Sequence, residues 1–249
     1  MSDEATRFAE ERRRDAAAMD ADVELKQLSR NWFDKSYRYR YSYNFTWLGR
    51  PIIQYPEDIV AIQELLWRVQ PDLVVETGVA HGGSLILSAS ILALLGRGSV
   101  IGIDVDIRKH NREAIEAHPL AKGIQLIEGS STDDKVVADV FRRAAKAERI
   151  VVFLDSNHTH EHVRRELELY SPLVRKGSYL VVFDTVIEEM PDAAFSDRPW
   201  ARGDNPMTAV REFLKLNPRF SVDEEFEQRL PFSVAPSGYL RCTADPASK

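Results

Sequence analysis

Short apolar runs alternate with longer amphipathic stretches from residue 57 onward. Runs the length of a buried strand occur at residues 73–76, 100–104, 124–127, 150–154 and 179–183. The spacing of apolar positions predicts helices at residues 57–69, 84–95, 108–117, 133–147, 159–170 and 207–216. This alternation predicts an α/β fold with a doubly wound, mostly parallel sheet that is covered by helices on both faces.

Both ends of the chain depart from this alternation. Residues 3–18 combine good helix formers with mixed charge, which predicts a solvated helix. The segment 32–47 carries aromatic residues at every second position between 37 and 45, which is typical of an edge strand or of an extended arm covering a cleft or a partner subunit. Residues 220–226 and 238–241 predict an antiparallel hairpin at the edge of the sheet.

These differences predict two regions. We expect residues 1–56 to form an N-terminal arm with helical and aromatic parts, and residues 57–249 to form the domain that contains the sheet. Residues 185–206, which we call the lid, have no apolar periodicity and collect Pro191, Pro199 and Pro206. A loop of that length inside a compact domain is usually functional or disordered.

The composition excludes several classes of protein. Apolar residues make up 44% and charged residues 29%, as in ordinary globular chains. With 33 basic and 39 acidic side chains the net charge is -6, so no global basic field would steer the protein onto nucleic acid. No apolar run reaches the roughly 20 residues of a membrane span, and the lone Cys242 cannot form an internal disulfide. We therefore expect a cytoplasmic protein, and a homo-oligomer stays open.

Acidic residues stand at or beside the ends of all five predicted strands, namely Glu76, Asp104, Glu128, Asp155 and Asp184. Ligands of open doubly wound sheets bind outside the carboxyl ends of the strands. Carboxylates that are held close together repel and raise one another's pKa. Such a cluster therefore indicates a site for a cation or for a ligand with several hydroxyl groups.

The first strand runs into a glycine-containing turn preceded by Glu76. The turn does not match the G-x-G-x-x-G of a dinucleotide site, because position 80 is Ala80. Glu76 would repel a pyrophosphate but attract a cationic amino group, and Asp104 is placed to accept both hydroxyls of a ribose. This pattern favours S-adenosylmethionine over NAD, with a nicotinamide-dependent oxidoreductase as the alternative.

Asp155 and Asp184 end consecutive strands and are candidates to share one hard cation, most simply Mg²⁺. Either residue alone is equally well explained as a helix cap or a surface acid. Three histidines follow Asp155, and His158 is the candidate for a general base or for a residue that orients metal-bound water. We expect His160 and His162 to be structural, and an iron oxygenase that uses the three histidines is a further alternative.

Several stretches together resemble a known family. They read TWLGRPIIQYPEDI, VVETGVAHGGS, IGIDVDIR, VFLDSNHTHEHV, YLVVFDT and RGDNPMTAVREFL. They are similar to the family named after the cephalosporin hydroxylase component of cephamycin biosynthesis, which also contains rhamnosyl O-methyltransferases and mycobacterial polysaccharide methyltransferases. The similarity covers about residues 44–241.

The resemblance implies a Rossmann-like class I methyltransferase that uses S-adenosylmethionine and Mg²⁺. Carried over residue by residue, it implies that the cofactor is held by Gln54, Glu76, Gly78, Ser84, Asp104 and Ser131. It also implies metal ligation by Asp155 and Asp184. Relatives often have Glu-Asp where this chain has Phe183-Asp184, so Thr185, a water or a lid acid such as Glu188 would complete the metal site.

The expected reaction is methyl transfer to a hydroxyl of a sugar or polysaccharide, with His158 and Asp155 as the catalytic residues. Rings at Tyr41, Tyr43 and Trp47 could stack on sugar faces, and Trp200 and Arg202 could close the lid over a glycan. A β-lactam or other natural-product intermediate is an alternative acceptor, and a family member that binds cofactor without catalysis is also open.

Overall fold

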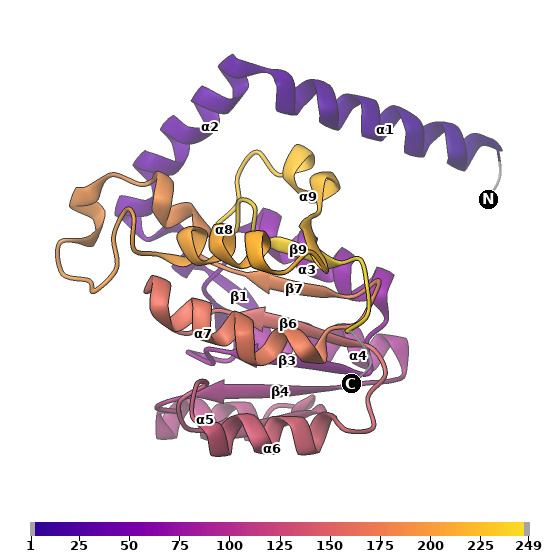
Figure 1. Cartoon of the computed structure of the whole chain (residues 1–249), viewed down its shortest axis with the longest axis vertical. Coiled ribbons are helices and arrows are strands. Elements are labelled where there is room, and N and C mark those ends of the chain that lie inside the picture. The colour runs from indigo at the N-terminus through magenta and orange to yellow at the C-terminus, as the bar shows by residue number, and fades with distance from the viewer. Residues whose placement is uncertain (1–2, 247–249) are drawn as a thin grey trace.

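The computed structural model describes residues 3–246, apart from the side chains of residues 192 and 193. A seven-stranded sheet lies at the centre of this part of the chain (Figure 1). Five neighbouring strands run parallel in the order β5-β4-β3-β6-β7, which confirms the predicted doubly wound arrangement. Their bounds are β3 (Leu73–Thr77), β4 (Ser99–Asp104), β5 (Ile124–Glu128), β6 (Ile150–Leu154) and β7 (Tyr179–Val182).

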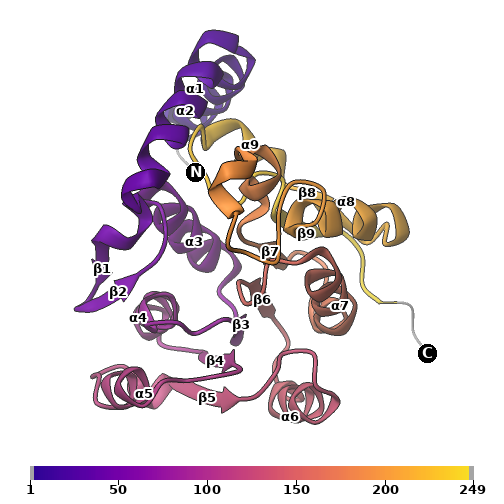
Figure 2. The same ribbon diagram turned by 90° about the vertical axis from the view of Figure 1, so that its left-hand side faces the viewer.

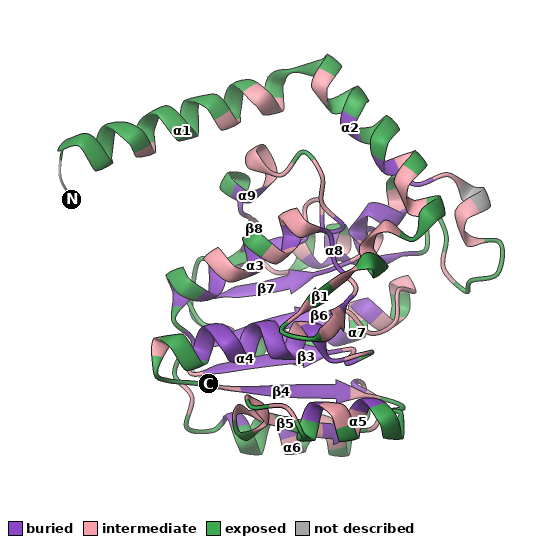
Figure 3. Ribbon diagram, turned by 180° about the vertical axis from the view of Figure 1, so that it is seen from behind, coloured by how far each residue is buried: buried purple, intermediate pink, exposed green. Residues whose placement is uncertain are grey.

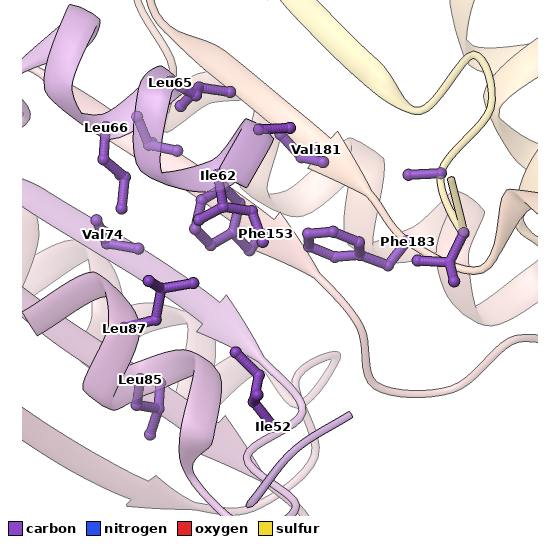
Figure 4. Packing of buried hydrophobic residues seen from close by; sticks show 14 of the residues in the cluster. Ile52, Ile62, Leu65, Leu66, Val74, Leu85, Leu87, Phe153, Val181 and Phe183 are labelled. Atoms are coloured by element: carbon purple, nitrogen blue, oxygen red, sulfur yellow. The ribbon is translucent and has the colours of Figure 1, made fainter. Parts of the chain in front are cut away.

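Helices cover both faces of the sheet, as Figure 2 shows in the view along the strands. One face carries α3 (Pro56–Val69), α4 (Gly83–Leu95) and α5 (Lys109–Glu116), and the other carries α6 (Asp134–Ala144), α7 (His160–Tyr170) and α8 (Pro206–Leu216). Each face has its own cluster of buried apolar side chains. In Figure 4, Leu65 and Leu66 of α3 and Leu87 of α4 surround Val74 and Phe153 of the sheet.

The edge of the sheet contains the predicted antiparallel strands. β9 (Tyr239–Cys242) pairs antiparallel with β7, and β8 (Phe220–Val222) pairs antiparallel with β9. The strand that comes later in the chain therefore takes the inner position. A short helix, α9 (Glu224–Arg229), lies between the two strands in the chain, so the connection is longer than a tight hairpin turn.

Two helices precede the sheet and project from it (Figures 1 and 3). They are α1 (Asp3–Ala21) and α2 (Val23–Ser36), separated by Asp22, whose side chain caps α2 by accepting a hydrogen bond from Leu25 N. The solvated helix predicted at residues 3–18 is confirmed, because no residue of α1 is buried. Among the described helices, none has the length and apolar character needed to cross a bilayer.

The extended conformation expected for the aromatic segment is wrong over most of its length. Trp32 lies in α2, and two short 3-10 helices follow, η1 (Tyr37–Tyr39) and η2 (Tyr41–Asn44). Only β1 (Phe45–Trp47) is extended, and it pairs with β2 (Arg50–Ile52) in a separate two-stranded sheet. Ring packing explains the folded shape, since the Tyr41 ring contacts Trp32 at 4.9 Å, Phe45 at 5.1 Å and Tyr55 at 5.4 Å between centroids.

The lid contains little regular structure, as its lack of periodicity predicted. It holds two 3-10 helices, η5 (Thr185–Glu189) and η6 (Asp192–Phe195), and an isolated bridge between Ala201 and Asp204. It ends at α8, where Asn205 and Thr208 form a capping box. Val186 and Ile187 are buried, so the first turn of the lid is part of the core.

Candidate active site

A cleft of about 870 Å³ opens beyond the carboxyl ends of β3, β4, β6 and β7. The strand order reverses between β3 and β6, and this is the place where doubly wound sheets bind ligands. The volume is within the range of small-molecule sites. Seven predicted site residues line the cleft: Gln54, Gly78, Ser84, Asp104, Asp155, His158 and Asp184.

Asp155, His158 and Asp184 form a cluster of potential metal ligands. One ligand atom of each residue lies within 4.8 Å of the others. Asp155 follows β6, Asp184 follows β7, and these strands are neighbours, so the topology brings the two carboxylates together. His158 Nε2 lies 3.1 Å from Asp184 Oδ2. The sequence placed His158 beside the metal, and the structure adds it to the set of groups within reach of an ion.

Electrostatics make the cluster fit a cation. Burial raises the pKa of Asp155 well above its ordinary value, and the nearby negative charges of Asp184 and Glu76 raise it further. A divalent ion would offset this repulsion, and carboxylate oxygens are ligands that Mg²⁺ prefers. Gln54 Nε2 donates to Asp155 Oδ2 at 3.3 Å and orients that carboxylate toward the cleft.

The backbone at the end of β7 is unusual. Asp184 has φ 55° and ψ 21°, a left-handed conformation that costs a non-glycine residue roughly 1 kcal/mol. Strained backbone of this kind is common at ligand sites, where the surrounding structure imposes it. The conformation turns the chain sharply after the buried Phe183, which follows β7, and Asp184 then lines the cleft.

Neither of the residues expected to complete the metal site joins the cluster. Thr185 is fully buried, and its hydroxyl donates to the Pro236 carbonyl at 2.6 Å. Glu188 Oε2 accepts hydrogen bonds from Gly203 N at 2.8 Å and from Asn205 Nδ2 at 2.6 Å. Both side chains hold the lid in place instead of facing the two aspartates.

The three histidines after β6 have different surroundings. The His158 ring meets the Trp200 ring edge-on, with centroids 4.7 Å apart and planes at 88°. His160 Nδ1 lies 2.8 Å from Thr208 Oγ1, and His162 Nε2 lies 3.0 Å from Ser156 Oγ. His160 and His162 do not line the cleft, so the geometry agrees with a structural role for both.

The acids at the ends of β3 and β4 are held by neighbouring groups. Glu76 is buried behind Ser84, whose hydroxyl donates to Oε1, and burial raises the pKa of Glu76 to about 8. The other oxygen, Oε2, is buried with no hydrogen-bond partner among the described residues. Asp104 Oδ2 accepts from Val79 N at 2.8 Å and from Ala80 N at 3.2 Å. An unpaired buried carboxylate oxygen and an acid at each strand end suit a ligand with a cationic amino group and ribose hydroxyls.

Ser131 is not brought into the cleft. It is buried, its hydroxyl lies 3.1 Å from His162 Nε2, and its carbonyl accepts from the Tyr170 hydroxyl at 2.8 Å. These partners belong to α7, on the face of the sheet that also carries α6 and α8. The serine therefore fixes the loop after β5 to α7.

The glycines of the turn are required by the packing of the protein itself. A Cβ at Gly78 would lie 2.0 Å from the Asp155 carbonyl oxygen, and one at Gly83 would lie 2.2 Å from the Pro51 carbonyl oxygen. A Cβ at Gly82 would lie 2.4 Å from the Ile115 side chain. A side chain at any of these three positions would therefore collide with a neighbouring element.

Some of the predicted aromatic and basic residues line the cleft, and others do not. Tyr43 and Trp200 line it, whereas Tyr41 packs among other rings and Trp47 Nε1 donates to Ser90 Oγ at 3.0 Å. Arg202 Nη2 donates to the Met190 carbonyl at 3.2 Å within the lid. Lining residues that the sequence did not single out are Tyr37, Arg40, Arg108, Phe195 and Arg198. No local sequence signal distinguishes them from other exposed side chains.

Comparison with known proteins gives one family. The profile of the family described as Rhamnosyl O-methyltransferase/CmcI matches residues 39–243, which is more than half of the chain. The chain is similar to the Rhamnosyl O-methyltransferase of Mycobacterium tuberculosis (strain ATCC 25618 / H37Rv), with 29% identity over 199 residues that cover 78% of this chain and 77% of the relative. It is 28% identical to the Rhamnosyl O-methyltransferase of Mycobacterium leprae (strain TN), covering 78% and 82%.

Solved structures share the fold. An apo structure of CmcI superposes with a TM-score of 0.57 at 21% identity, covering 81% of this chain and 77% of that one. A cofactor-bound protein from MTB superposes with a TM-score of 0.53 at 17% identity, covering 77% and 82%. At these identities the likeness concerns the arrangement of helices and strands.

Proposed function

This chain belongs to the Rhamnosyl O-methyltransferase/CmcI family and is an S-adenosylmethionine-dependent O-methyltransferase, and we propose that its acceptor is the hydroxyl of a sugar. The observation that carries the methyltransferase assignment is the Asp155–His158–Asp184 cluster in the cleft. The same cleft is lined by Asp104 at the end of β4, and Glu76 of β3 lies directly behind the lining residue Ser84. Family membership argues against the oxidoreductase and iron-oxygenase alternatives.

We assign the cofactor to the side of the cleft formed by β3 and β4. Gln54, Gly78, Ser84 and Asp104 line that side, and Glu76 lies directly behind Ser84. Each carboxylate oxygen has two lone pairs, so Asp104 is able to hold the turn and accept ribose hydroxyls together. Ser131 is left out of this assignment because of its position against α7.

Asp155 and Asp184 would hold Mg²⁺, with waters and acceptor oxygens as the other ligands. When bound, the metal supplies a Lewis acid that lowers the pKa of a coordinated hydroxyl, and S-adenosylmethionine supplies an activated methyl group. Imidazole suits Mg²⁺ poorly, so we assign His158 to the proton and not to the ion. Lid closure and the fixed strand ends would hold the acceptor oxygen in line, a contribution of several kcal/mol.

The surroundings of His158 suit proton transfer. Its Nε2 faces Asp184 at 3.1 Å, and the edge-on contact with Trp200 fixes the plane of the ring. A hydrogen bond from Nε2–H to the carboxylate would leave Nδ1 unprotonated, and Nδ1 would then accept the proton of the acceptor hydroxyl. Asp155 takes part in catalysis by orienting the acceptor through the metal site.

The sugar acceptor rests on two supports. The curated relatives carry the name Rhamnosyl O-methyltransferase, and the cleft is lined by Tyr43 and Trp200, aromatic residues of the kind that stack on sugar faces. A natural product that carries a sugar fits these walls equally well.

Calorimetric titration with S-adenosylmethionine, followed by methyl transfer from the radiolabelled cofactor to a panel of rhamnosides, tests the proposal. We expect binding, transfer that stops with EDTA, and a loss of about 100-fold or more in Asp155→Asn and in Asp184→Asn. Glu148→Gln is the control, since that exposed acid lies far from the cleft in the loop before β6. Transfer that EDTA leaves intact would contradict the metal assignment, and a panel in which no sugar accepts methyl would contradict the acceptor class.

A further inference from the structure

The turn between β3 and α4 has a backbone that needs support. Ala80 has φ 45°, a left-handed conformation that disfavours residues with a side chain. Gly78 and Gly82 in the same turn are also left-handed, at φ 90° and 81°. The glycines adopt this conformation without steric cost, so the strain falls on Ala80, which keeps it only where neighbouring groups impose it.

Side chains from three other elements hold the polar groups of this turn. Asp104, at the end of β4, accepts from Val79 N and Ala80 N. Asn111, which is 3% exposed in α5, donates from Nδ2 to the Ala80 carbonyl at 2.9 Å. Arg50 in β2 donates to the His81 carbonyl from Nε at 3.0 Å and from Nη2 at 2.6 Å.

Arg50 and Asn111 also bind each other. Arg50 Nη2 donates to Asn111 Oδ1 at 3.1 Å, so the two side chains act as one unit against two consecutive carbonyls. A guanidinium donates strong hydrogen bonds because it is charged. Both carbonyls are thereby directed toward β2 and α5, which leaves the opposite side of the turn to face the cleft.

Backbone packing against the same two elements is an independent observation. Gly83 meets the Pro51 carbonyl and Ile52 of β2, and Gly82 meets Ile115 of α5. The elements that supply Arg50 and Asn111 thus also enclose the turn sterically. β2 belongs to a two-stranded sheet outside the central one, so its contact with the turn is not a consequence of the main sheet.

We propose that Arg50 and Asn111 are positioning residues that set the affinity for S-adenosylmethionine by fixing the turn of residues 78–83. The inference rests on the proposed function, because it takes this turn as the seat of the cofactor. Binding would in turn stabilise the β1–β2 hairpin, since coupling between two events is reciprocal. The N-terminal arm is then a component of the cofactor site and not only a cover for the acceptor.

The test measures S-adenosylhomocysteine binding by calorimetry, and amide exchange of residues 79–82 by mass spectrometry, on the full chain. We expect Asn111→Ala and Arg50→Ala each to weaken binding about 10-fold, as the loss of one such hydrogen-bonding unit would. Exchange in the turn should accelerate, while exchange in β6 stays unchanged. Because the two residues form one unit, the double variant should lose less than the product of the single losses.

Glu113→Ala is the matched control, since this residue lies in the same helix with a largely exposed side chain. Arg50→Lys keeps the charge but only one donor group, so it should fall between the wild type and Arg50→Ala; it also serves if Asn111→Ala fails to fold. Wild-type affinity in both alanine variants, with unchanged exchange in the turn, would overturn the inference and leave the proposed function intact. Failure of the wild-type protein to bind the ligand would instead overturn the proposed function.

Discussion

The turn after β3 has no room for even a single added methyl group at position 78. A Cβ at Gly78 would lie 2.0 Å from the Asp155 carbonyl oxygen, and neither the Cβ nor that backbone oxygen can rotate away. We expect Gly78→Ala to lower the free energy of unfolding by more than about 3 kcal/mol, since steric conflict adds to the cost of a left-handed residue. Chemical denaturation measures this loss.

Gly177→Ala separates the two contributions. Gly177 has nearly the same φ, 88° against 90°, but nothing lies within 4 Å of its added Cβ. It should therefore show only the conformational cost, about 1 kcal/mol. Equal losses in the two variants would mean that the clash with Asp155 is relieved by movement of the loop.

At the scale of elements, the carboxylate of Glu188 connects the beginning of the lid to its end. Glu188, in the first turn of the lid, accepts from Gly203 and Asn205 near its end. Burial works to raise the pKa of Glu188, but these hydrogen bonds and nearby Arg211 hold it below its ordinary value. The charged form is therefore the one that ties the two ends of the lid together.

Glu188→Ala should open the lid without affecting the cofactor side. We expect trypsin to cut after Arg202 about 10-fold faster, because losing the tie lowers the local opening free energy. Affinity for S-adenosylhomocysteine should stay within about 2-fold of wild type, since Glu188 does not line the cleft. Asp197→Ala is the control, an exposed acid of the same lid; the same acceleration there would mean that any loss of charge loosens the segment.

The sheet and its helices were predictable because burial imposes a period. β6 is buried at every position and is an unbroken apolar run, and β3 is buried throughout and apolar up to Glu76. The prediction for the aromatic segment was wrong, because its alternating rings contact one another within folded turns and not along an extended strand. The inner place of β9 depends on pairing between distant segments, which leaves no local pattern.

The candidate site was likewise predictable only in part. Acids at strand ends were predictable, because parallel topology brings those ends together whatever the loops do. Thr185 and Ser131 also follow strands, yet the direction of each side chain depends on local backbone that the sequence does not reveal. Asn111 and Arg50 act across 31 positions or more on a turn to which no spacing rule connects them.

At the scale of the whole molecule, the N-terminal arm has two parts of unequal weight. No residue of α1 is buried, and Arg12 reaches Glu225 only in an exposed ion pair at 3.7 Å. Phe33, Ile52 and Tyr55 by contrast belong to the core cluster on the α3 face. We propose that residues 57–249 form the methyltransferase domain and that residues 22–56 complete its core.

Two truncations test this division. A chain starting at residue 22 should keep its free energy of unfolding to within about 1 kcal/mol, because exposed ion pairs contribute little. A chain starting at residue 57 should fail to fold, since each buried side chain it lacks is worth about 1.5–3 kcal/mol against a marginal total. Cooperative thermal unfolding of the shorter chain would show that the arm is a separate unit.

The position of β9 determines when the sheet can be completed as the ribosome synthesises this protein. Among the described strands, β8 is synthesised before β9 but pairs with β9 alone, and β7 needs the same partner on its other side. Until residues 239–242 emerge, the growing polypeptide therefore presents an unpaired apolar edge, the kind of surface that chaperones shield from aggregation. The parallel half of the sheet can form during translation, but the antiparallel edge is completed only when β9 pairs with β7 and β8.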